Sequence, residues 1–105
     1  MNELPVACVL SALNPDHRRR EQALLQEHLA SVREVVERDD GYAFRYDPDA
    51  GLFARMAELV ALEHVCCPFL DFALTWDHGG DPWLHIGGGA RVKDFVLQTF
   101  APQLA

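Results

Sequence analysis

Two segments that alternate between apolar and polar residues around a turn limit the fold more than any other feature of the chain. In residues 33–47, Asp40-Gly41 separates two runs of strand-forming residues, which is a strong signal for a β-hairpin. Residues 70–88 repeat this pattern around a second turn. We therefore predict two hairpins, whose apolar faces must be covered by another layer of structure.

The segments before and between the hairpins carry helical signals. Asn14 is a suitable N-cap with Pro15 at the first helical position, and apolar residues recur at helical spacing to about Val32. Asp49 caps a second predicted helix, which runs to about Cys66. These helices supply the layer that the hairpins need.

The two ends of the chain complete the predicted fold. Residues 5–13 are apolar on both faces and predict a strand inside the sheet. A run of three glycines, residues 87–89, leads into a short predicted helix over residues 90–100. The resulting order is β-α-ββ-α-ββ-α. We predict a single α+β domain over residues 1–105, with an antiparallel or mixed sheet and helices packed on one face.

Composition and charge exclude several classes of function. A 105-residue chain that is 50% hydrophobic can bury one core without staples. Its formal net charge of −7 at pH 7 argues against direct binding of nucleic acid. No run reaches the ~18 apolar residues of a membrane span, and the N-terminus lacks the basic region of a signal peptide. Three cysteines, an odd number, fit a reducing compartment with free thiols, so we expect a cytoplasmic protein.

One carboxylate stands out in the second predicted helix. On a helical wheel its apolar residues fill an arc of roughly 120°, and Glu63 lies near the centre of that arc. Cys67 falls beside Glu63, and Cys66 lies at the edge of the arc. A buried carboxylate must be paired, bound to a metal or protonated with a raised pKa. The purely structural explanation is a bond from Glu63 to backbone amides or to one of the basic residues Arg45, Arg91 and His64.

The adjacent cysteines lie at the end of this helix, because Pro68 disfavours helical geometry at Cys67. The C-terminus of a helix is the negative end of its dipole, which raises the pKa of a thiol. Glu63, if ionised, acts in the same direction. This environment argues against a thiolate nucleophile at neutral pH and favours a bound cation.

Thiolates prefer soft or borderline ions, so the predicted ligand is zinc or another thiophilic ion such as Cu(I), Hg²⁺ or As(III). The predicted metal ligands are Glu63, Cys66 and Cys67. Cys8 is a candidate third thiolate, and His64 is a nearby donor. The spacing places a further histidine, at position 85, on the opposite face of its strand, which makes it a weaker candidate. The predicted function is metal sensing, buffering or detoxification.

The motif run Glu63-x-x-Cys66-Cys67-Pro68-Phe69 belongs to a wider resemblance that spans about residues 59–97. It is followed by a Gly-x-Pro-Trp-Leu hairpin and then by Gly-Ala-Arg-x-x-x-Phe, which start at positions 80 and 89. The combination resembles a group of small uncharacterised bacterial proteins and the tails of some mercury-resistance-type regulators. The resemblance implies an association with heavy metals. It does not imply DNA binding, because the chain has no helix-turn-helix portion.

Three alternative functions remain open from the sequence. The first is a thiol-dependent enzyme, an oxidoreductase or lyase, that uses Cys67 with Glu63 as its proton partner. The second is a non-catalytic interaction module with structural cysteines, which forms a homodimer or binds a partner through an aromatic sheet face. The third is an anion site at the glycines of residues 87–89, where backbone amides can bind a phosphate or carboxylate. The aromatic residues that predict the sheet face are Tyr42, Tyr46, Trp76 and Trp83.

Overall fold

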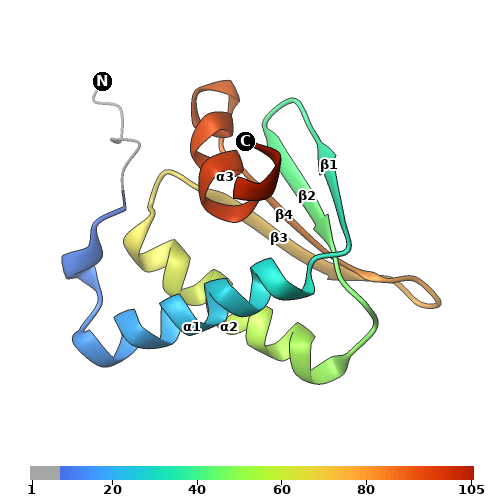
Figure 1. Ribbon diagram of the computed structural model, residues 1–105, viewed down its shortest axis with the longest axis horizontal. Helices are drawn as coiled ribbons and strands as arrows, with labels where there is room; N and C mark the ends of the chain where they lie inside the picture. The colour runs from blue at the N-terminus through green and yellow to red at the C-terminus, as the bar shows by residue number, and fades with distance from the viewer. Residues whose placement is uncertain (1–7) are drawn as a thin grey trace.

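The computed structural model describes residues 8–105, which form an antiparallel sheet covered by helices (Figure 1). The helices and strands are α1 (Pro15–Ser31), β1 (Glu34–Glu37), β2 (Gly41–Arg45), α2 (Ala50–Cys66), β3 (Asp71–Trp76), β4 (Pro82–Gly87) and α3 (Lys93–Phe100). The strands are ordered β1-β2-β4-β3, and each neighbouring pair is antiparallel. The predicted α+β class is therefore confirmed.

The first predicted strand does not form where the structure describes it. The prediction covered residues 5–13, of which 5–7 lie outside the described residues. Residues 8–13 contain no strand, and Leu10–Ala12 form a short 3-10 turn, η1. The backbone N–H of Val9 instead donates to the carbonyl of Cys66 at 2.6 Å. This segment therefore lies against the end of α2 rather than in the sheet.

The ends of both long helices agree with the predicted caps. Asn14 Oδ1 accepts from the backbone N–H of His17 at 2.8 Å, and Asp49 Oδ1 accepts from the N–H of Leu52 at 3.1 Å. The helix α2 ends at Cys66. The next residue, Cys67, precedes Pro68 and has a non-helical backbone with φ −121°, as predicted. Capping residues and proline thus set the position of the two cysteines.

Both predicted hairpins form, with one difference at the first turn. The loop consists of residues 38–40, and Gly41 is already the first residue of β2. A Cβ at Gly41 would come within 2.0 Å of the carbonyl oxygen of Ile86 on β4. Glycine is therefore required there for the close approach of β2 and β4, and not for the turn itself.

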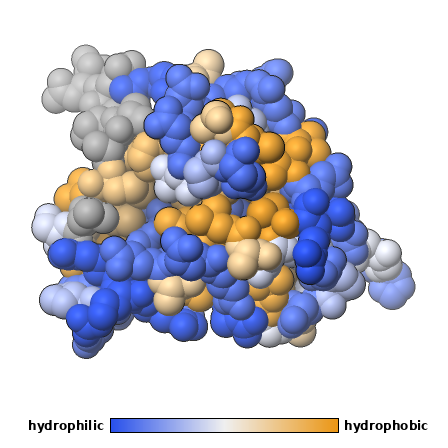
Figure 2. Space-filling model, in the orientation of Figure 1, coloured by the Kyte–Doolittle hydropathy of each residue, from blue (hydrophilic) through white to orange (hydrophobic). Residues whose placement is uncertain are grey.

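The core lies between the sheet and the helices. Phe44 on β2, Leu84 and Ile86 on β4, and Met56 and Leu59 on α2 are all at most 1% exposed. α3 packs on β2 and β4, and α2 packs on β3 and on α1. Figure 2 shows this helical side, where a band of apolar residues runs between α3 and α1 and is bordered by hydrophilic residues. Among the helices described, none is long and apolar enough to cross a membrane.

A buried histidine ties α1 to the rest of the core. His28 is 0% exposed, and its Nε2–H donates to the carbonyl of Phe100 at 2.8 Å, because a carbonyl can only accept. Its Nδ1 therefore accepts from the hydroxyl of Tyr46, at 2.6 Å. Burial lowers the pKa of His28 to about 4. The imidazole is neutral at pH 7 and has both nitrogens bonded, so it is a structural residue.

Candidate metal centre

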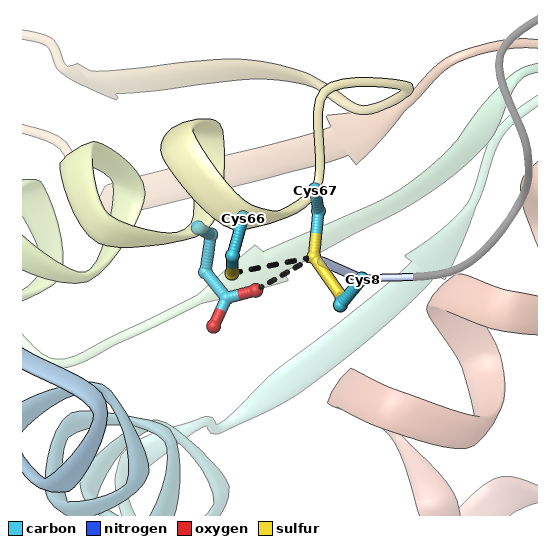
Figure 3. Close-up of side chains that lie close together, drawn as sticks. Cys8, Cys66 and Cys67 are labelled. Atoms are coloured by element: carbon cyan, nitrogen blue, oxygen red, sulfur yellow. Dashed lines mark hydrogen bonds between the residues drawn. A yellow bond between two sulfur atoms is a disulfide. The ribbon is translucent and has the colours of Figure 1, made fainter. Parts of the chain in front are cut away.

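Three cysteines from two distant segments meet at the C-terminal end of α2. Cys66 and Cys67 close the helix, and Cys8 reaches them from the segment before η1 (Figure 3). Cys8 and Cys67 are joined in a disulfide, with an S–S distance of 2.02 Å. Cys66 is the free cysteine of the three and is buried.

The disulfide corrects the expectation of free thiols. That expectation rested on the odd number of cysteines, which says nothing about which of them lie close together. The hydrogen bond from Val9 to Cys66 holds the N-terminal segment beside α2, and this places Cys8 next to Cys67. A disulfide between the two adjacent cysteines does not form, and their Sγ atoms are 3.7 Å apart.

Glu63 is buried beside these sulfurs, as predicted. Its side chain is 1% exposed, and Oε2 lies 3.4 Å from Sγ of Cys67. A disulfide sulfur carries no hydrogen, so this contact is a hydrogen bond only when Glu63 itself donates a proton. The other carboxyl oxygen, Oε1, has no hydrogen-bond partner within the described part of the chain. One of the proposed basic partners, Arg45, pairs instead with two other carboxylates.

The environment of Glu63 favours its protonated form. Burial is the largest cause, followed by a hydrogen-bond interaction with the Glu21 carboxyl on α1 and by the charge of Glu21; together they raise the pKa of Glu63 to about 9. Glu21 is itself only 8% exposed. Glu63 therefore carries a proton at neutral pH, which is one of the three ways in which a buried carboxylate can persist.

The pKa of the free thiol, Cys66, is raised, which is the direction predicted for the cysteines at this helix end. Burial, and after it the negative charge of Glu63 and Glu21, raise the pKa of Cys66 to about 11. Cys66 is therefore a neutral thiol at pH 7, and Cys67 has no thiol while the disulfide is present. Both observations argue against the alternative of a cysteine nucleophile at this site.

The ligand atoms of this cluster form one compact set. One atom each from Cys8, Glu63, Cys66 and Cys67 lies within 4.8 Å of every other. The structure thus brings together the three predicted metal ligands and adds the candidate Cys8. His64 is exposed and lies outside this set. A set of three sulfurs and one oxygen has the composition that thiophilic ions prefer.

The other predicted donors have different partners. His85 lies on the sheet face opposite Ile86, as predicted, and its Nε2 is 3.0 Å from Oδ1 of Asp40. In the glycine run, the N–H groups of Gly88 and Gly89 both donate to the carbonyl of Asp40, at 3.1 and 3.3 Å. These two amides are therefore not available to an anion, which removes the basis for an anion site there.

Sequence reasoning missed one residue of the site. Glu21 contributes to the raised pKa of both Glu63 and Cys66, and the apolar pattern of its helix does not predict this contact. A signal was present: Glu21, Leu24 and His28 are spaced by three and four residues, so they share one helix face. All three are buried.

None of the protein families, curated proteins or solved structures compared with the chain matches it. The functional argument therefore rests on the geometry and chemistry of the cluster.

Proposed function

We propose that the protein, with its disulfide reduced, binds a thiophilic metal or metalloid ion through Cys8, Cys66 and Cys67, beside Glu63. The observation that supports this most is the convergence of the four ligand atoms within 4.8 Å in a buried site. The ligands come from two distant parts of the chain, since Cys8 and Cys67 are separated by 59 positions in the sequence. Hydrophobic packing alone has no need for a carboxylate at the centre of three sulfurs.

Oxidation state controls this site. In the disulfide form two of the three sulfurs are bonded to each other, and only Cys66 and Glu63 remain as donors. Reduction by an external thiol reductant supplies two electrons and two protons and breaks the S–S bond. The two new thiols and Cys66 then make three. The reduced form is the one that binds, which is consistent with the expected cytoplasmic location.

Charge balance indicates which ion the site prefers. Three thiolates around Zn²⁺ leave a net charge of −1, whereas three thiolates around As(III) are neutral. The causes that shift the pKa of Glu63 and Cys66 include burial and neighbouring carboxylates but no lysine or arginine. An uncompensated buried charge costs several kcal/mol. We therefore propose As(III) as the preferred ion, with Hg²⁺, which is neutral with two thiolates, as the next.

The reaction with arsenous acid also suits the high thiol pKa. Three thiols and As(OH)₃ form three As–S bonds and release three water molecules, so each thiol proton leaves with a hydroxyl group. No net proton is released and no charge develops in the buried site. Glu63, which sits beside Cys67, can pass these protons to the departing hydroxyl groups. The biological role is sensing, buffering or detoxification of such an ion, in agreement with the resemblance noted above.

A structural role for the disulfide is the second candidate, and the bond itself favours it. Cys8–Cys67 closes a loop of sequence separation 59, and a loop of that size stabilises the fold by about 4 kcal/mol in the chain-entropy estimate. In this case the cysteines serve the fold alone, and the protein is an interaction module or homodimer. Its test is the same experiment, because a purely structural site binds no ion.

The test is arsenite binding by the reduced protein. The protein is reduced, separated from reductant under nitrogen and dialysed against arsenite, and bound arsenic is measured by mass spectrometry. We expect one arsenic per chain in the reduced protein and none in the oxidised protein. Cys8→Ser, Cys66→Ser and Cys67→Ser should each lower the affinity at least about tenfold, whereas His64→Ala, an exposed neighbour, should bind as the wild type does. Equal binding by the oxidised protein or by the serine variants would refute the site.

A further inference from the structure

A second concave site lies on the sheet face opposite the helices. It is a cavity of about 470 Å³, a volume typical of small-molecule sites. It is distinct from the sulfur cluster, since none of its residues belongs to that cluster. The lining residues are Arg38, Asp40, Ala43, Ala73, Thr75, Trp83 and His85.

Small side chains create the hollow. In the register of the sheet, His85 on the central strand β4 lies between Ala43 on β2 and Ala73 on β3. Alanine on both neighbouring strands leaves the space beside the imidazole unfilled. In the next row, Trp83 on β4 is paired with Thr75 on β3 and forms one wall. The cavity is therefore lined by two alanines, an indole, an imidazole and a hydroxyl group.

The charges around the cavity leave one cation without a partner. Arg45, in the same row as Trp83, forms ion pairs with Glu34 and Asp81. Asp40 is hydrogen-bonded to His85, whose Nε2 lies 3.0 Å from Oδ1. Arg38 has no carboxylate within ion-pair distance in the described part of the chain. Its guanidinium is thus free to bind an anion with two parallel N–H donors.

We propose that this cavity binds a small organic carboxylate with a flat apolar body. The carboxylate pairs with the guanidinium of Arg38, and the body lies in the space beside the imidazole of His85, against the indole of Trp83. The Thr75 hydroxyl is the further donor at the edge. A flat body is favoured because the space is bordered by the rings of His85 and Trp83, with only the small side chain of an alanine below it.

A second copy of the chain is a poorer occupant of the same face. A two-fold contact places the cavity of one copy against the cavity of the other, and two concave surfaces leave a void between them. It also brings together two chains of net charge −7. The expected homodimer, if it forms, is therefore better accommodated at a sheet edge than across this face.

The experiment uses benzoate as the probe and benzamide as its neutral analogue, with amide chemical shifts of the full chain as the readout. We expect saturable shifts at residues 38–43, 73–75 and 83–85 with benzoate, and at least about tenfold weaker binding of benzamide. Arg38→Gln should weaken benzoate to the benzamide level, and Arg19→Gln, on α1, should change nothing. Ala73→Trp, which fills the cavity, should abolish the binding of both compounds.

Three results would overturn the proposal. They are the absence of saturable shifts at the cavity residues, equal benzoate affinity in the wild type and Arg38→Gln, and a dimer in sedimentation experiments that Ala73→Trp dissociates. Circular dichroism of each variant establishes that it is folded before binding is scored. Arsenite binding should be unaffected in every one of these variants, because none of the changed residues belongs to the sulfur cluster, so failure here is separate from failure of the sulfur site.

Discussion

His28 and Glu63 are both ionisable side chains that are at most 1% exposed, but they differ in whether their polar atoms have hydrogen-bond partners. His28 has a partner at each nitrogen, whereas Glu63 has a carboxyl oxygen with no hydrogen-bond partner among the described residues. The surroundings of His28 are held by hydrogen bonds, and those of Glu63 include a covalent bond between Cys8 and Cys67.

This difference separates a structural residue from a functional one. Burying a polar group costs free energy unless the group is bonded, so a satisfied group such as His28 requires no further explanation. An unsatisfied group next to sulfur atoms does require one. The predictions that follow test whether the two residues differ in this way.

Reduction of the disulfide should have a large effect at pH 7, and it should be confined to the Glu63 end of the molecule. Loss of the Cys8–Cys67 bond should lower the free energy of unfolding by about 4 kcal/mol. Hydrogen exchange should accelerate in residues 8–13 and 63–70, and should remain slow around His28. An equal acceleration of hydrogen exchange around His28 would mean that the His28 and Glu63 regions do not unfold independently.

Replacement of both residues by methionine tests the comparison directly. His28→Met removes the partner of Tyr46 and Phe100 and should cost about 3 kcal/mol in denaturant unfolding. Glu63→Met in the oxidised protein removes a carboxyl that must take up a proton on folding at pH 7, so stability should be equal to or higher than that of the wild type. A loss above about 2 kcal/mol in Glu63→Met would show that the carboxyl is a structural residue after all.

Acid should weaken the protein through His28. The unfolded histidine takes up a proton near pH 6.5, but the folded one does so only near pH 4. Stability should therefore fall as the pH drops from 6.5 to 4, by about 3 kcal/mol in total. The measurement is urea unfolding at several pH values, with His28→Met as the control that should lose this dependence.

Alkali should weaken the protein through Glu63, in the opposite direction. The unfolded carboxyl loses its proton near pH 4.5, whereas the folded one keeps it to about pH 9. Its contribution to stability is complete at low pH and is lost progressively as the pH rises from 4.5 to 9. In unfolding experiments on the oxidised protein, Glu63→Gln should flatten this decline. An identical decline in that variant would assign it to another group.

The sequence was sufficient for most of the fold. Some features act on their neighbours along the chain, so the sequence pattern alone predicts where the helices and strands begin and end. These features are the caps Asn14 and Asp49, the helix-ending Pro68 and the alternating apolar residues of the two hairpins. The strand prediction over residues 5–13 is wrong in its described part because the segment is held at the end of α2 by a backbone hydrogen bond from Val9 to Cys66 and by the Cys8–Cys67 disulfide, which are tertiary contacts. Local periodicity does not reveal such contacts.

The site was predictable only in part. The wheel placed Glu63 beside Cys67, because four residues along one helix bring side chains together. The bond from Cys8 to Cys67 and the approach of Glu21 join segments that are distant in sequence, and no local rule fixes such distances. The cavity on the open sheet face likewise depends on cross-strand register, which sets Ala43, His85 and Ala73 in one row.

X-ray absorption at the arsenic edge of the reduced, arsenite-loaded protein tests the central claim most directly. The account predicts one arsenic bound to three sulfur atoms, with one sulfur lost in the Cys66→Ser variant and the wild-type spectrum retained in His64→Ala. An arsenic that keeps its oxygen neighbours, or a spectrum that Cys66→Ser leaves unchanged, would contradict it.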